Sequence, residues 1–169
     1  MFNLMSFATS KNAESGIIGS TLTSIRALLT NLLHSPETGV VKLTVATGQG
    51  PIPHGYVVGI IQGNKETCGK AIAGRLTAKA VCLDKSTGGL ASEATGYFRM
   101  TGVADVALVA QLTPSNGDRV IVSATDGKGT TAIGVGTHRQ IGWIVDNTGY
   151  ATTGLVKVLL DWDEITVRK

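Results

Sequence analysis

The chain has 169 residues, of which 43% are hydrophobic and 16% are charged. This length fits one domain with a sizeable core and an appended arm, and the low share of charge favours packing against partner proteins. No run of about 18 apolar residues occurs, which argues against a membrane-spanning helix.

The first 19 residues have no sustained periodicity, yet they begin with bulky apolar side chains. Disordered tails are usually short of such residues, whereas an arm that docks on a neighbour needs them. We therefore predict an extended arm over residues 1–19, with a disordered terminus as the alternative. The predicted contact residues of this arm are Phe2, Leu4, Met5 and Phe7.

Residues 20–36 are predicted to form a short helix and a linker. Apolar residues recur at steps of three and four, Ser20 or Thr21 can cap the start, and Pro36 prevents much continuation. The helix packs either on the domain's own sheet or on a neighbouring subunit. The apolar stripe consists of Leu22, Ile25, Leu28, Leu29, Leu32 and Leu33.

Residues 37–169 alternate short β-branched runs with Gly, Asp and Asn turns. Such spacing, without helices between strands, indicates a mainly β fold: a small antiparallel barrel or sandwich. The Asp126-Gly127 turn predicts a hairpin. The predicted strands are Val40–Ala46, Tyr56–Gln62, Lys79–Asp84, Gly96–Met100, Val106–Leu112, Arg119–Thr125, Thr130–Val135, Gln140–Val145 and Leu155–Asp161.

The net charge of +3 arises from one segment, between Lys65 and Lys85. It forms either a solvated face or a patch for an acidic partner. Nucleic-acid binding is not expected, because the aromatic-basic sequence Tyr97-Phe98-Arg99 places its two aromatic residues on opposite faces of a strand.

The sequence gives no strong sign of catalysis. Gly134-Val-Gly-Thr-His-Arg resembles a phosphate loop only superficially and is expected to be a tight turn, since a strand follows it. His34, His54 and His138 have no acid or cysteine at ligand or triad spacing. We therefore expect no enzyme, with no catalytic, cofactor-binding or metal-binding residues.

A carboxylate cluster follows the last predicted strand and contains Asp161, Asp163 and Glu164, with Trp162 among them. It can bind a metal or serve acid-base chemistry, but a charged strand edge that prevents aggregation is favoured. If the strand continues, Asp161 and Asp163 share one face and Trp162 lies on the other.

Cys68 and Cys82 are predicted to be buried free thiols, because they have neither zinc spacing nor a disulfide framework around them. The first ten residues also lack a cationic start and an apolar stretch typical of a signal peptide. We therefore expect synthesis in a reducing cytoplasm.

Three motifs follow one another in the C-terminal third: Gly117-Asp118-Arg119-Val120, then Ile141-Gly142-Trp143, then Val156-Lys157-Val158-Leu159-Leu160. In this order they resemble the strand motifs of the head decoration (cement) proteins of tailed bacteriophages. The long N-terminal arm and helix depart from the family's pattern.

This resemblance implies a tulip-like β-barrel that sits as a homotrimer on the capsid surface. It implies a structural virion protein that clamps subunits of the major capsid protein after synthesis in the bacterial host cytoplasm. No cofactor, direct nucleic-acid contact or membrane is implied. The alternatives are another virion β module, from a tail tube, tail fibre or baseplate, or a carbohydrate-binding β domain, for which only Trp143 and Trp162 provide large aromatic surfaces.

Overall fold

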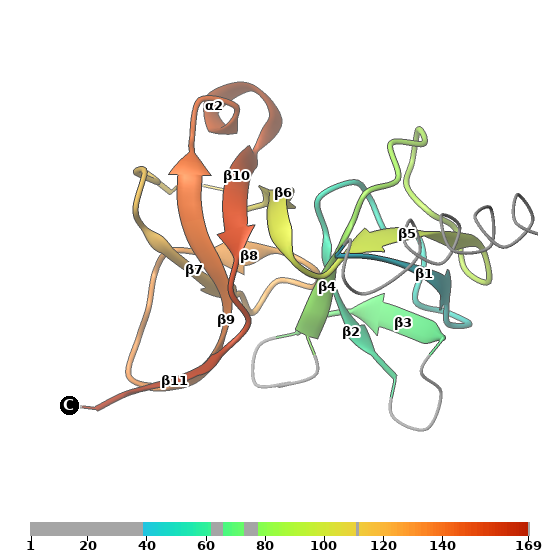
Figure 1. The fold of residues 1–169 in the computed structure, drawn as a ribbon, viewed down its shortest axis with the longest axis horizontal. Helices are drawn as coiled ribbons and strands as arrows, with labels where there is room; N and C mark the ends of the chain where they lie inside the picture. The colour runs from blue at the N-terminus through green and yellow to red at the C-terminus, as the bar shows by residue number, and fades with distance from the viewer. Residues whose placement is uncertain (1–38, 62–65, 73–77, 111, 169) are drawn as a thin grey trace, which may run out of the picture. The chain divides into compact units, whose positions relative to one another are not determined.

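The computed structural model describes residues 39–61, 66–72, 78–110 and 112–168. This part of the chain is mainly β, as predicted: a closed five-stranded barrel is followed by a six-stranded sheet (Figure 1). One short helix, α2 (Tyr150–Thr153), precedes the last long strand. The predicted arm over 1–19 and the predicted helix and linker over 20–36 lie outside the described residues.

The barrel closes in the order β1-β3-β2-β4-β5, and all its pairs are antiparallel except β1 with β3. Alternate residues face its interior, such as Leu43 and Val45 on β1. This alternation follows from the two-residue period of a strand. The strands are β1 (Val40–Val45), β2 (Val57–Ile60), β3 (Thr67–Lys70), β4 (Ala78–Cys82) and β5 (Thr95–Arg99).

The second sheet has the order β6-β10-β9-β7-β8, and β11 pairs with the first half of β9. A parallel bridge between Leu108 and Gly129 brings the end of β6 next to β8, so the sheet curls around its own core. The strands are β6 (Gly102–Ala107), β7 (Arg119–Val122), β8 (Gly129–Thr130), β9 (Gly136–Asp146), β10 (Leu155–Leu160) and β11 (Glu164–Val167).

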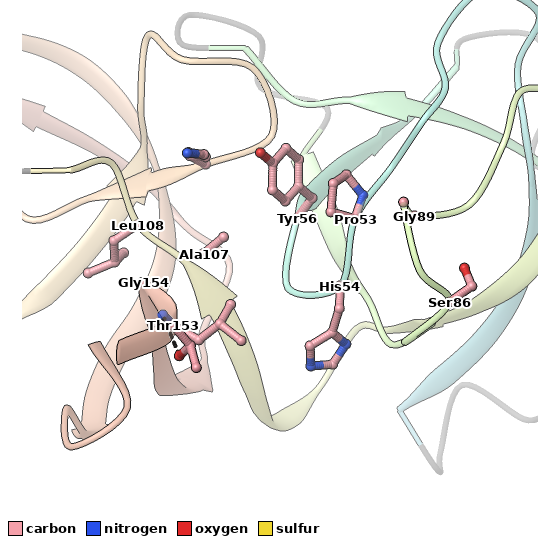
Figure 2. Close-up of a pocket in the computed structure, with 12 residues that line it drawn as sticks. Pro53, His54, Tyr56, Ser86, Gly89, Ala107, Leu108, Thr153 and Gly154 are labelled. Carbon is pink, nitrogen blue, oxygen red and sulfur yellow. Dashed lines mark hydrogen bonds between the residues drawn. The ribbon is translucent and has the colours of Figure 1, made fainter. Parts of the chain in front are cut away.

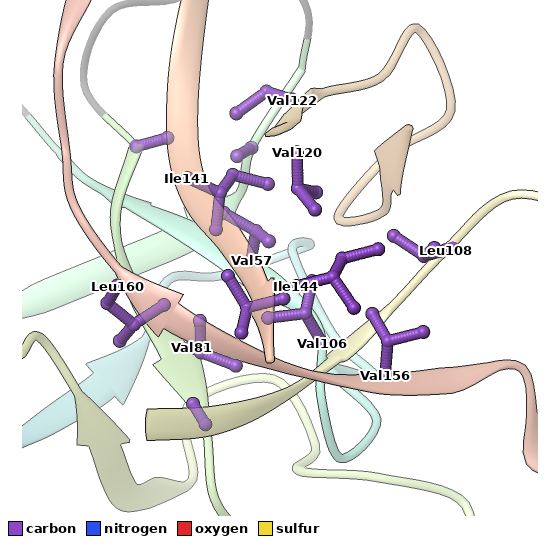
Figure 3. Packing of buried hydrophobic residues seen from close by; sticks show 14 residues of the cluster. Val57, Val81, Val106, Leu108, Val120, Val122, Ile141, Ile144, Val156 and Leu160 are labelled. Carbon is purple, nitrogen blue, oxygen red and sulfur yellow. The ribbon is translucent and has the colours of Figure 1, made fainter. Parts of the chain in front are cut away.

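Two buried clusters share β2 and β4 as a common wall. Val58 of β2 faces the cluster inside the barrel, whereas its neighbour Val57 packs with the second sheet (Figure 3). Likewise, Cys82 of β4 faces the barrel interior and Val81 faces the other side. Because successive side chains on a strand point to opposite faces, this wall is apolar on both sides.

Main-chain hydrogen bonds join the two halves as well. The turn of the β7–β8 hairpin reaches the barrel, where Val57 N–H donates to the Gly127 carbonyl and Gly127 N–H donates to the Ala71 carbonyl, each at 2.7 Å. Ala107 N–H at the end of β6 donates to the Gly55 carbonyl at 2.9 Å. The barrel and the second sheet therefore form one compact unit over residues 39–169.

The predicted hairpin at Asp126-Gly127 is confirmed, since β7 pairs with β8 across it. The predicted strand Thr130–Val135 is wrong over most of its length, because β8 ends at Thr130 and the following residues form a connection without strand structure. The predicted strand Val106–Leu112 overlaps β6 only at Val106 and Ala107, so both its start and its end are wrong. β6 starts at Gly102, whose positive φ of 82° allows a tight connection from β5.

Candidate interaction surface

The predicted capsid-contact residues Phe2, Leu4, Met5 and Phe7 lie outside the described residues, so their role stays a prediction. The described part of the chain offers a different contact surface, on the outer face of the second sheet.

Four outward-facing side chains lie directly across from one another on adjacent strands. Val103 of β6 is opposite Leu159 of β10, which is opposite Trp143 of β9, which is opposite Arg119 of β7. Val103 and Leu159 are 44% and 46% exposed. We call these four residues the outer row. The outer row exposes apolar side chains to water. In an antiparallel sheet with one buried face, the residues on the other face are normally polar.

Arg119 covers the aromatic end of the outer row. Its guanidinium carbon lies 4.6 Å from the centroid of the Trp143 ring, within the range of a cation–π contact. The Trp143 indole N–H is directed to the Asp161 carboxylate at 3.4 Å. Both contacts hold the Trp143 side chain against the sheet. Trp143 therefore loses less conformational entropy when a partner covers it.

Charged residues of both signs border the outer row. Lys157 of β10 lies across from Asp105 of β6 and Asp146 of β9, and its ammonium is 3.6 Å from the Asp146 carboxylate. Hydrogen bonds from the amide and hydroxyl of Thr148, followed by the charge of Lys157, lower the pKa of Asp146. With Arg119, two bases border the outer row, and Asp161 beside Trp143 is a third acid next to Asp105 and Asp146.

Figure 2 shows a groove of about 440 Å³ that is lined by residues of the barrel and of the second sheet. One of its lining residues, His54, forms an ion-pair contact with Asp105 of the second sheet. His54 Nε2 lies 3.1 Å from Asp105 Oδ2, and the His54 side chain is only 18% exposed. The contact joins residues 51 positions apart, so no local spacing could have predicted it. Among the described residues, His54 Nδ1 is buried without a hydrogen-bond partner. The groove is lined by Pro53, His54, Tyr56, Ser86, Gly88, Gly89, Ala107, Leu108, Lys128, Thr153, Gly154 and Leu155.

The cysteines are buried free thiols, as predicted, and both belong to the cluster inside the barrel. Burial raises the pKa of Cys68 to about 12 and that of Cys82 to about 11. Since the thiolate is the reactive form, these side chains are inert in the folded protein.

The carboxylate cluster is arranged differently from the prediction. β10 ends at Leu160, so Asp161 and Asp163 lie in the connection to β11 and not on one strand face. Asp161 accepts a hydrogen bond from Gln140 Nε2 at 3.0 Å, and the Trp162 indole N–H donates to the Met100 carbonyl at 2.6 Å. These contacts give Asp161 and Trp162 structural roles. Glu164 begins β11, an edge strand.

The remaining sequence candidates are dispersed. His138 Nε2 lies 2.9 Å from the Gly134 carbonyl, and His34 is outside the described residues. In the basic segment, Lys79 and Lys85 are exposed.

Across residues 39–61, 66–72, 78–110 and 112–168, no group of three or more His, Cys, Asp and Glu side chains could hold a metal ion. No helix within these ranges is long and apolar enough to cross a membrane. No protein-family model and no curated protein matches the chain.

Proposed function

We propose that the chain is a structural virion protein, a decoration or cement protein on the outside of a phage head that stabilises contacts between major capsid subunits. Two things support this: the resemblance of the C-terminal strand motifs to that family, and the outer row. In this proposal, Phe2, Leu4, Met5 and Phe7 contact the major capsid protein. The β domain forms a homotrimer, and no cofactor takes part.

The outer row is the observation that carries the proposal. Trp and Arg dominate the energetics of many protein interfaces when they lie centrally and become fully desolvated. Here a Trp-Arg pair continues into two half-exposed aliphatic residues, and every apolar square ångström removed from water contributes about 25 cal/mol. Because acidic and basic side chains both border the outer row, a second copy can place opposite charges against each other.

The proposal is tested by adding purified protein to heads that lack it. Full-length protein is expected to bind filled heads at a copy number near that of the major capsid protein, and to form trimers by native mass spectrometry. Leu159→Asp places a charge in the outer row and is expected to weaken trimer formation and head binding by at least about tenfold, since burying an unpaired charge is costly.

Val135→Asp is the matched control. Val135 is 61% exposed and lies outside the outer row, so this variant should assemble and bind like the original chain. Failure of the original protein to bind heads contradicts the cement function. Normal trimers of Leu159→Asp contradict the role of the outer row, and a ring of six copies favours a tail-tube module.

A further inference from the structure

The last strand, β11, has an unoccupied edge within the described part of the chain. There it pairs with the first half of β9 alone, in a narrow ribbon that extends from the second sheet (Figure 1). No residue of this ribbon, Gly136–Arg139 with Glu164–Val167, belongs to either buried cluster. A two-stranded ribbon is only marginally stable by itself, so its open edge is suited to pairing with another strand.

The alternation of hydrogen-bonded and non-hydrogen-bonded pairs along the ribbon identifies which main-chain N–H and C=O groups of β11 face outward. Gln140 N–H donates to the Asp163 carbonyl at 2.8 Å, which makes these two residues a hydrogen-bonded pair of the ladder. Since hydrogen-bonded and non-hydrogen-bonded pairs alternate, Glu164 and Thr166 direct their main-chain groups away from β9. The Glu164 N–H donates to the side chain of Asp163 at 2.8 Å.

The charges along this strand are self-complementary. Acidic Glu164 stands at its beginning, basic Arg168 follows its end, and both are exposed. Between them, Thr166 is the central residue. An antiparallel partner with the same sequence therefore brings its basic end to the acidic end of this strand.

We propose that β11 pairs with β11 of a second copy of this chain, antiparallel, about a two-fold axis at Thr166. In this register Thr166 faces Thr166 of the second copy as a hydrogen-bonded pair. Glu164 faces Arg168 of the second copy, and Ile165 faces Val167. The four strands then form a continuous sheet, β9-β11-β11-β9, across the two chains.

Other registers that keep the outward main-chain groups paired are less favourable. A shift of two residues places Glu164 or Arg168 opposite Thr166 and loses both charge pairs. A shift of four places Glu164 opposite Glu164, or Arg168 opposite Arg168, where like charges repel. The charge pattern therefore selects the register centred on Thr166.

This pairing does not depend on the proposed capsid role, because it concerns two copies of the chain in solution. If the outer row also forms a trimer, pairing through β11 links one trimer to the next. The two contacts use different surfaces, so each can be removed without the other.

Charge reversal tests the pairing by sedimentation of the full chain at low salt. Glu164→Lys and Arg168→Glu are each expected to weaken β11-mediated association by about tenfold, because each places like charges opposite each other at two symmetric positions. The double variant Glu164→Lys/Arg168→Glu restores opposite charges and should associate like the original chain. Lys85→Glu, an exposed change outside the ribbon, is the matched control.

A disulfide test reports the register directly. Thr166→Cys is expected to form a covalent dimer on mild oxidation, since the α-carbons of a hydrogen-bonded pair lie about 5.5 Å apart, within disulfide range. Thr137→Cys, one strand further in and opposite Thr166, should not cross-link, because three strand spacings separate its two copies. The buried native thiols provide little background.

The proposal is overturned if the double charge reversal associates no better than the single variants. It is also overturned if Thr166→Cys cross-links no faster than Thr137→Cys. Because the ribbon lies outside both clusters, all these variants should keep the original circular dichroism spectrum.

Discussion

At the residue scale, Gly142 shows how one position can serve both a strand and a sequence motif. It lies within β9 at a φ of 154°, and a Cβ there would overlap the carbonyl oxygen of Leu159 on β10. The sequence placed Gly142 in a strand and in the Ile141-Gly142-Trp143 motif. It could not indicate the close approach of β10, because that contact depends on strand order.

Substitution of Gly142 by alanine is expected to lower the free energy of unfolding by about 2–4 kcal/mol, since both the backbone conformation and the Leu159 carbonyl must shift. Gly134→Ala is the control, because its Cβ would meet nothing within 4 Å. Urea unfolding of both variants measures the difference. Equal stabilities of the two variants would contradict this account of Gly142.

At the element scale, the strands that the sequence predicted well have strong apolar alternation or long β-branched runs. β1, β2, β4, β5, β7, β9 and β10 all overlap predicted strands. β3 was missed because Thr67–Lys70 contains Gly69 and only one fully buried apolar side chain, Cys68. β11 was missed because its charged neighbours looked like a terminal cluster, and its pairing partner lies far away in the sequence.

The shared wall of β2 and β4 gives a test at this scale. Val57 and Val58 are adjacent and fully buried, but they face different clusters. Val57→Ala and Val58→Ala are each expected to cost about 2 kcal/mol, from lost apolar burial and the cavity left behind.

Tryptophan fluorescence reports on unfolding of the second half only, because both tryptophans, Trp143 and Trp162, belong to the second half of the chain. We expect Val58→Ala, on the barrel side, to shift the tryptophan transition as much as the circular dichroism transition. A shift in circular dichroism alone would mean that the two halves unfold separately.

At the scale of the whole molecule, the mainly β fold followed from turn spacing, but the division into a barrel and a curled sheet did not. The wall residues are apolar on both faces, which a single sequence cannot distinguish from an ordinary buried strand. The outer row could not be predicted from the sequence for a related reason. Val103, Leu159 and Trp143 come together only when β6, β10 and β9 are placed side by side.

The buried thiols make the stability of the whole molecule depend on pH in the alkaline range. Their folded pKa values, about 12 for Cys68 and about 11 for Cys82, lie above the value of 9.0 that an unburied thiol has. Protonated thiols are therefore favoured by folding. This contribution is fully present below pH 9 and is lost as pH rises through 11 and 12.

Urea unfolding between pH 8 and pH 11 measures this loss. The original chain should lose stability with pH more steeply than Cys68→Ala/Cys82→Ala, by up to about 1.4 kcal/mol per pH unit for each thiol. The slopes of unfolding free energy against pH are compared, and not the free energies themselves, because the alanine substitutions also change packing. Parallel slopes for the two proteins would contradict the role of the thiols.

The separation of the β9–β11 ribbon from both buried clusters has an evolutionary consequence. Substitutions in Glu164–Val167 are not constrained by either core, so this strand can diverge while the fold is inherited unchanged. Reversal of Glu164 and Arg168 together preserves recognition among descendants and excludes the ancestral chain. Two diverged versions of this chain in one cell can thereby keep their subunits from mixing without any change in the architecture that carries them.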